Sequence, residues 1–207
     1  MNAALLGEGP TDRALLPLLR WLLGRSTTVA GQIDWVDTSR IAGEGVLASK
    51  VARGLAANPC DLLFVHRDSD RQPVEWRYAE IASAAGSHPH VGVVPVRMTE
   101  AWLLIDEAAI RAAAGRPSGR EDLGLPAASR LEDVADPKAI LREALVTAHA
   151  ATGRRAARFD PGAALYRVAD LVEDWSPLRH LAAFRRLERD TRSALTTLGH
   201  PLRAADV

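Results

Sequence analysis

The sequence predicts an α/β protein with a parallel, wound sheet of about four strands and flanking helices, followed by an all-helical C-terminal extension. Two observations support this fold class. Short apolar runs alternate with helical patterns through the first half of the 207-residue chain, which is typical of parallel strands joined by right-handed crossovers. From about residue 106 the strand patterns stop, whereas helical patterns continue. We therefore expect a sheet domain over 1–106 and a helical extension over 107–207 packed on it.

The first strand is expected at 3–6, where an apolar run ends at a glycine. A helix should follow from about Pro10, because proline suits the first turn of a helix. Pro17 lies two turns further on and should kink or split this helix, since proline has no amide hydrogen to donate. Glu8 then lies on the loop between strand and helix, and Asp12 lies on the first helical turn.

Three more apolar runs predict the remaining strands. They cover 33–36, 62–65 in a strand that ends at Asp68, and 91–96. The segment 115–136 is rich in Gly, Pro, Ser and charge, which indicates a connector or a flexible lid. Helices are expected at 43–57 and 73–85 between the strands, and at 139–151, 162–174 and 178–198 after them.

Acidic residues follow three of these strands at the point where each one ends. Glu8 follows the first strand, Asp68 and Asp70 follow the third, and Glu100 comes shortly after the fourth. The carboxyl ends of parallel strands meet at one edge of a sheet, so we expect these side chains to lie close together with Asp12. Asp68 and Asp70 are two residues apart, and in an extended segment their side chains should point the same way.

Several carboxylates in one crevice repel one another, and a divalent cation relieves that repulsion. With oxygen ligands, and only His66 as a nearby nitrogen donor, Mg²⁺ or Mn²⁺ fits best. The alternative is a loop rich in aspartate that forms turns and helix caps, with Asp12 complementing a helix dipole. The predicted metal ligands are Glu8, Asp12, Asp68, Asp70 and Glu100.

The segments EGPTD at 8–12 and DSD at 68–70 resemble the TOPRIM fold of topoisomerases, DnaG-type primases and OLD-family nucleases. That fold has a glutamate after its first strand and a DxD pair after a later one. The chain is most similar to small bacterial TOPRIM-like proteins of unknown function related to OLD (overcoming lysogenization defect) nucleases. The similarity extends to an acid that opens a Trp-Leu-Leu segment at 100–104, to Pro137-Lys138, and to the Ser-Pro-Leu at 176–178.

The resemblance implies a cytoplasmic hydrolase that cleaves phosphodiester bonds of DNA or RNA with Mg²⁺ or Mn²⁺. It implies that Glu8, Asp68 and Asp70 are catalytic, with Glu8 also a general acid or base, and that Asp12 and Glu100 complete a second metal site. OLD-type TOPRIM domains work with an ABC-type ATPase, fused or encoded alongside. The resemblance therefore also implies such a partner and an effector role in defence against phages and mobile elements.

Basic residues near these acids and on the last helix are candidates for contact with nucleic acid. Arg67 contacts phosphate or pairs with a nearby acid. Lys138 reaches the scissile phosphate or is an ordinary exposed lysine at the start of a helix. Arg185, Arg189 and Arg192 fall on one helix face, which either contacts nucleic acid or is simply solvated.

Composition excludes several other classes of protein. The 26 basic and 26 acidic side chains balance, so no global field attracts nucleic acid. Cys60 is the only cysteine, which excludes an internal disulfide framework. No apolar run reaches the roughly 20 residues that span a bilayer, and the N-terminus lacks a signal-peptide pattern. A catalytically silent regulatory module of an ATPase complex, another doubly wound enzyme such as a phosphatase, and a homodimer remain open.

Overall fold

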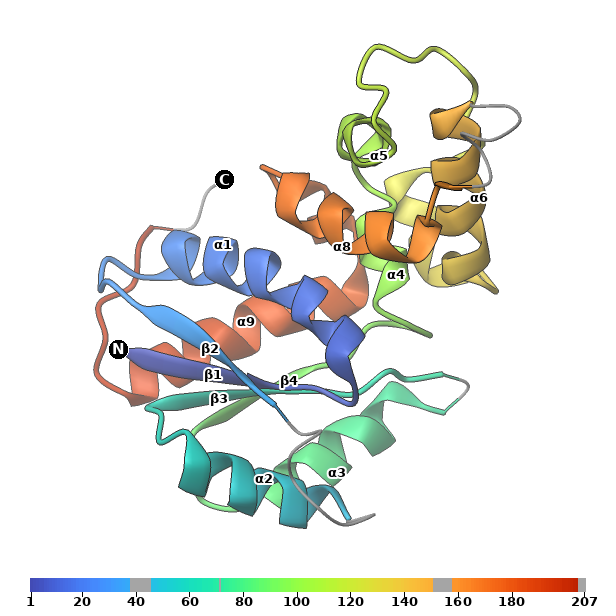
Figure 1. The fold of residues 1–207 in the computed structure, drawn as a ribbon. Helices are drawn as coiled ribbons and strands as arrows, with labels where there is room; N and C mark the ends of the chain where they lie inside the picture. The colour runs from blue at the N-terminus through green and yellow to red at the C-terminus, as the bar shows by residue number, and fades with distance from the viewer. Residues whose placement is uncertain (38–45, 71, 151–157, 205–207) are drawn as a thin grey trace.

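The computed structural model describes residues 1–37, 46–70, 72–150 and 158–204. Its centre is a four-stranded sheet in which neighbouring strands run parallel, in the order β2-β1-β3-β4 (Figure 1). This architecture confirms the predicted α/β fold with a parallel sheet. The strands are β1 (Asn2–Leu6), β2 (Gln32–Val36), β3 (Leu62–His66) and β4 (His90–Val93).

The two central strands are apolar because helices cover both faces of the sheet. β3 is buried at every position, and β1 is buried from Ala3 to Leu6. Such continuous burial is the reason that strands of parallel sheets lack a polar and apolar alternation. Leu5 of β1 lies between Trp35 of β2 and Phe64 of β3 in the register. The parallel register brings the ends of β1 and β3 to the same edge of the sheet.

Helices α1 (Leu16–Ser26) and α9 (Ala182–Thr197) cover one face of the sheet, and α2 (Leu47–Ala57) and α3 (Val74–Ala85) cover the other (Figure 1). Each face has its own hydrophobic cluster. The cluster under α2 and α3 is small, whereas the cluster under α1 and α9 continues into the helical half of the chain. The second half therefore packs against the sheet through one shared core.

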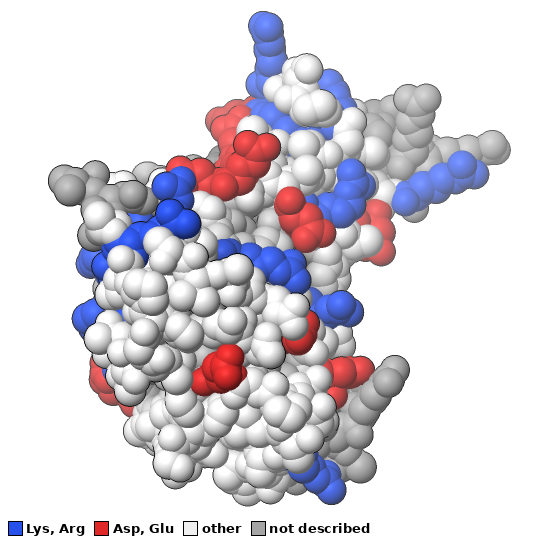
Figure 2. All heavy atoms as spheres, turned by 90° about the vertical axis from the view of Figure 1, so that its left-hand side faces the viewer, with Lys and Arg blue, Asp and Glu red and all other residues white. Residues whose placement is uncertain are grey.

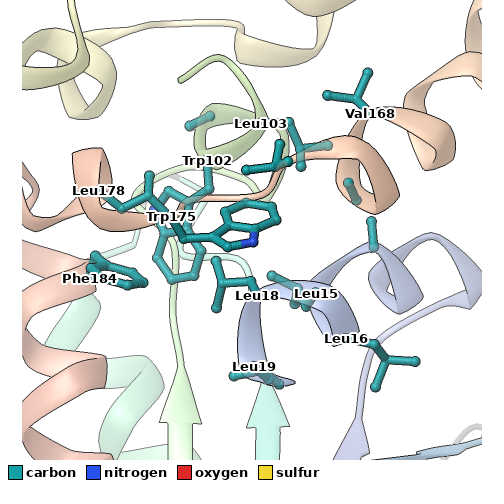
Figure 3. Close-up of a cluster of buried hydrophobic side chains, with 14 of the residues drawn as sticks. Leu15, Leu16, Leu18, Leu19, Trp102, Leu103, Val168, Trp175, Leu178 and Phe184 are labelled. Atoms are coloured by element: carbon teal, nitrogen blue, oxygen red, sulfur yellow. The ribbon is translucent and has the colours of Figure 1, made fainter. Parts of the chain in front are cut away.

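The second half is helical in its described residues. Three tryptophan and phenylalanine side chains anchor it: Trp102 and Phe184 meet edge to face at 5.9 Å, and Trp175 lies beside them (Figure 3). Its elements are α4 (Glu100–Leu103), α5 (Glu107–Ala113), η3 (Ala128–Asp133), α6 (Pro137–His149), α8 (Pro161–Leu171) and η4 (Ser176–His180), followed by α9.

Prolines set two of the element boundaries, one as expected and one not. The first helix is split, as expected, into a 3-10 segment η1 (Pro10–Leu15) and α1, with Pro17 in the first turn of α1. β4 ends at Val93 rather than at residue 96, because Pro95 has no amide hydrogen with which to continue the ladder. The expected helices at 43–57 and 139–151 extend in part over residues outside the described ones.

The segment 115–136 packs against the core. Leu123 is 7% exposed and Leu131 is fully buried, and both belong to the main hydrophobic cluster. Burial of these side chains against the core holds the segment in place. Of the two predicted alternatives, a connector or a flexible lid, this packing favours the connector; isolated leucines in a sequence rich in Gly and Pro give no periodic signal of such burial.

Charges of both signs are spread over the surface. On the face that is the left-hand side of Figure 1, charged side chains gather in the upper part, whereas the lower part is mostly uncharged (Figure 2). No helix among the described residues is long and apolar enough to cross a membrane. Electrostatic recognition of a ligand must therefore come from local grooves rather than from a field of one sign.

We expect Trp102→Ala to lower the free energy of unfolding by about 3–5 kcal/mol, because it removes a large side chain from the centre of the shared core. Trp102 is 1% exposed. The matched control is Trp76→Ala, since Trp76 is 56% exposed, and it should cost less than about 1 kcal/mol. Urea denaturation measures both. Equal losses in the two variants would contradict a core shared by sheet and helices.

Candidate active site

Asp12 is folded back over the turn that follows β1. Its Oδ2 accepts hydrogen bonds from the backbone N–H of Glu8 at 2.7 Å and of Gly9 at 3.0 Å. This close approach needs a glycine at residue 7, because a Cβ there would lie 2.7 Å from Asp12 Oδ2. The turn thus fixes one oxygen of Asp12 and leaves Oδ1 to face the neighbouring strand end.

His66, the last residue of β3, faces that oxygen. Its Nε2 lies 3.6 Å from Asp12 Oδ1, 3.3 Å from Asp68 Oδ1 and 3.2 Å from Thr99 Oγ1. Its Nδ1 lies 3.0 Å from the carbonyl oxygen of Val93 on β4. The imidazole therefore joins residues that follow or belong to β1, β3 and β4, and it is 1% exposed.

These contacts favour an imidazolium at residue 66. Nδ1 faces a carbonyl oxygen and must donate a hydrogen bond to it, while Nε2 faces two carboxylate oxygens. Burial alone would lower the pKa of His66, but the hydrogen bond to Asp68 and the charges of Asp12 and Asp68 outweigh it and raise that pKa. The buried imidazole of His66 thus lies between two aspartates that favour its protonated form.

Thr99 and Glu100 connect the end of β4 to this network. The backbone N–H of Thr99 donates to Asp68 Oδ1 at 3.0 Å. Glu100, the first residue of α4, is 8% exposed, and its Oε1 lies 3.7 Å from Lys138 Nζ. Burial raises the pKa of Glu100; Lys138 opposes this rise, whereas the nearby charge of Asp68 adds to it.

Three of these carboxylates line one pocket. Asp12, Asp68 and Glu100 face a space of about 120 Å³, and Lys138 forms part of its wall. The remaining wall comes from Thr11, Ala14, Met98, Thr99 and Leu165. Acids that follow three different strands thus meet at the carboxyl edge of the sheet, as the sequence predicts. We call this space the acidic pocket.

Glu8 lies outside the lining of the acidic pocket but within electrostatic reach of it. Its Oε1 pairs with Arg67 Nη1 at 2.9 Å. Burial raises the pKa of Glu8, Arg67 lowers it, and the charges of Asp68 and Asp12 raise it further. The carboxyl groups of Glu8 and Asp68 are therefore at the same end of the sheet.

Asp70 does not join the other acids. It is 60% exposed at its side chain and pairs with Arg77 at 3.4 Å. The chain turns at this point: Asp70 has a φ of 53°, and its N–H donates to the carbonyl oxygen of Arg97. Asp68 and Asp70 therefore do not point the same way. The expectation that they converge was wrong because it assumed an extended chain.

The oxygen donors of the acidic pocket match the chemistry of a hard divalent ion. In the described part of the chain, however, no three His, Cys, Asp or Glu side chains are already arranged to hold a metal. Basic side chains also reduce the repulsion among the acids. Arg67 pairs with Glu8 and Lys138 pairs with Glu100. His66 lies against both Asp12 and Asp68. Repulsion alone therefore does not require a metal ion.

The basic residues proposed for nucleic acid fall into two places. Arg67 contacts Glu8 and Glu80 and lies beside the acidic pocket, where Lys138 forms part of the wall. Those on α9 lie elsewhere, in a separate hollow of about 430 Å³ at the junction of α1, η4 and α9. We call it the α9 arginine pocket; its arginines are Arg25, Arg179, Arg185, Arg189 and Arg192.

Sequence reasoning noted His66 as a nitrogen donor near the acids, a place that the structure bears out, and did not assign Thr99 to the site. The signal for His66 was its place at the end of a fully apolar strand and two residues before Asp68. Thr99 directly precedes α4, and its side-chain oxygen faces His66 and Asp68 rather than capping that helix. Both roles depend on contacts between strands, which a local pattern does not specify.

We expect the stability of the protein to fall as pH rises above about 6.5, and His66→Gln to remove much of this dependence. The folded state binds the imidazole proton more tightly than the unfolded chain does, where the pKa is near 6.5. The stabilisation is therefore complete at pH values below the pKa of the unfolded chain. It is lost as pH rises through the raised pKa of the folded state. Urea denaturation at several pH values measures it, with exposed His180→Gln as control. A His66→Gln curve parallel to that of the wild type would contradict a buried imidazolium.

Comparisons with known proteins do not place the chain in a family. Neither protein-family models, nor curated proteins, nor solved structures gave a match. The TOPRIM resemblance therefore remains an expectation from the sequence. The function must be argued from the acidic pocket itself.

Proposed function

We propose that the protein is a Mg²⁺- or Mn²⁺-dependent nuclease of the TOPRIM type, with its active site at the acidic pocket. The observation that carries this proposal is the meeting of Asp12, Asp68 and Glu100, each following a different strand, around one small space with a lysine in its wall. Strand ends of open parallel sheets are the usual place for ligands. Carboxylate oxygens with an adjacent lysine suit both a hard ion and a phosphate group.

Asp12, Asp68 and Glu100 would hold the ion after small movements of their side chains. The ion would polarise the phosphate and lower the pKa of a bound water molecule. His66 would keep both aspartates in position, and Lys138 would offer positive charge to the phosphate. Glu8 has a raised pKa at the rim, which suits a group that transfers a proton to or from the reacting oxygens.

The partners proposed for this nuclease have less support. An ABC-type ATPase and a role in defence against phages rest on the resemblance of the sequence motifs alone. The described residues form no contact that identifies either one. A large ATPase recovered with the protein, or encoded beside it, would support both.

One observation favours a second candidate, a catalytically silent module that keeps the acidic edge for structure or regulation. Each acid of the predicted site already has a basic partner on the chain, including Arg77 for Asp70. A site built as a closed network of ion pairs can be stable without a metal. Metal binding separates the two candidates, because a silent module of this kind would show none.

We expect purified protein with Mn²⁺ or Mg²⁺ to cleave nucleic acid, and Asp68→Asn to lower the rate by at least about 100-fold, since it removes a central pocket ligand. Asp34→Asn is the matched control, because Asp34 is exposed on β2, and it should retain the full rate. Asp70 lies outside the acidic pocket, so Asp70→Asn should lose less than about tenfold.

Isothermal titration with Mn²⁺ gives the second readout. We expect saturable binding to the wild type and to Asp34→Asn, and greatly weakened binding to Asp68→Asn. Cleavage that survives Asp68→Asn would contradict the active site. No Mn²⁺ binding and no cleavage of any DNA or RNA would favour the silent module.

A further inference from the structure

A second hollow adjoins the acidic pocket. It has a volume of about 440 Å³ and lies between η1, α1 and α8. Arg13, Arg20, Tyr166 and Asp170 are the polar side chains that line it. We call it the η1–α8 groove.

The groove and the acidic pocket share a wall. Ala14 lines both of them. Asp12 and Arg13 are consecutive in η1 and line the acidic pocket and the groove respectively; Leu165 and Tyr166 do the same on α8. A chain-like ligand lying in the groove would therefore pass the opening of the acidic pocket.

The groove offers positive charge that is not already used. Arg13 and Arg20 are exposed, and within the described parts of the chain neither guanidinium forms an ion pair or hydrogen bond. Asp170 is the one acidic side chain among the described residues of the lining. Most arginines near the acidic pocket differ in this respect, since Arg67 and Arg77 are both paired with acids.

Tyr166 adds an aromatic surface to the same groove. It is 36% exposed, so part of its ring is available for stacking. Cationic side chains combined with an exposed aromatic ring are the usual means by which proteins hold single-stranded nucleic acid. A duplex would use the arginines but not the ring, because the faces of its bases are stacked on one another.

We propose that the η1–α8 groove binds single-stranded nucleic acid, with Arg13 and Arg20 contacting phosphates and Tyr166 stacking on a base. The inference rests on the proposed function for the class of its ligand, and it names the strandedness and the binding residues. It also meets a physical need of that function. The carboxylates of the acidic pocket repel a phosphate backbone, so cations beside the pocket must hold it there.

The α9 arginine pocket is the rival docking place. It has more arginines, but Glu188 pairs with Arg179 and Asp190 pairs with Arg189. No described residue lines both this pocket and the acidic pocket. A strand bound there would not be presented to the carboxylates. The η1–α8 groove is therefore the better candidate for a substrate path.

Fluorescence anisotropy with a labelled oligothymidylate of about 20 nucleotides tests the proposal. The measurements are made in EDTA, so that binding is separated from cleavage. The charge-neutralising variant is Arg13→Gln/Arg20→Gln. Its matched control is Lys50→Gln/Arg53→Gln, which removes two positive charges from α2 on the other face of the sheet. Thermal melting confirms that each variant is folded.

We expect Arg13→Gln/Arg20→Gln to raise Kd at least about tenfold and to reduce the slope of log K against log salt by about 1.4, because two phosphate contacts are lost. Tyr166→Ala should raise Kd by about tenfold with little change in the salt slope, since stacking releases no counterions. The α2 control should match the wild type in both quantities. A duplex of the same length should bind more weakly than the single strand.

Several results would overturn the inference. They are an unchanged Kd and salt slope in Arg13→Gln/Arg20→Gln, tighter binding of the duplex, or a loss of binding in Arg185→Gln/Arg192→Gln alone. The proposed nuclease function fails separately. If the groove variants weaken binding as expected but no metal supports cleavage, the groove proposal holds and the nuclease proposal fails. If cleavage depends on Asp68 but is unaffected by the groove variants, the nuclease proposal holds and the groove proposal fails.

Discussion

The carboxyl edge of the sheet depends on the buried imidazole of His66, which contacts two aspartates and a backbone carbonyl. His66 has no access to water, and an unpaired charge in such a place would cost several kcal/mol. Asp12 and Asp68 offset this cost beside Nε2, and the carbonyl oxygen of Val93 accepts a hydrogen bond from Nδ1. Each partner lies in or after a different strand, so removing any one leaves the others with unmatched charge. The same network that neutralises the acids therefore also fixes the relative positions of β1, β3 and β4.

Much of the fold follows from patterns that are local in sequence. The four strands, their parallel arrangement and most helices appear at the expected places, because apolar runs and helical periodicity report burial directly. The errors fall where the sequence pattern does not match the burial or the extent of an element. β4 is short because Pro95 interrupts its ladder, and the segment that contains Leu131 is packed although its pattern resembles a loop. α5 was missed, since its seven residues are too few for a periodic signal.

The location of the site could be predicted from the sequence, but the set of residues that form it could be predicted only in part. Parallel strands guarantee that acids after β1, β3 and β4 share an edge, which explains why Asp12, Asp68 and Glu100 meet. The direction of Asp70 was not predictable, because it is set by a backbone hydrogen bond to Arg97 in another loop. Nor could the sequence show which basic side chain forms an ion pair with which acidic side chain. Those choices are made by tertiary packing.

The origin of Lys138 has a consequence for the chain as a whole. Asp136 caps α6, and this places the lysine in the first turn of that helix, against Glu100. Leu165 of α8 supplies another part of the same wall. A fragment that stops at residue 106 would keep the carboxylates of Asp12, Asp68 and Glu100. It would lack Lys138 and Leu165, which form part of the pocket wall. The helical half thus supplies part of the cavity wall, and its described residues share one hydrophobic core with the sheet.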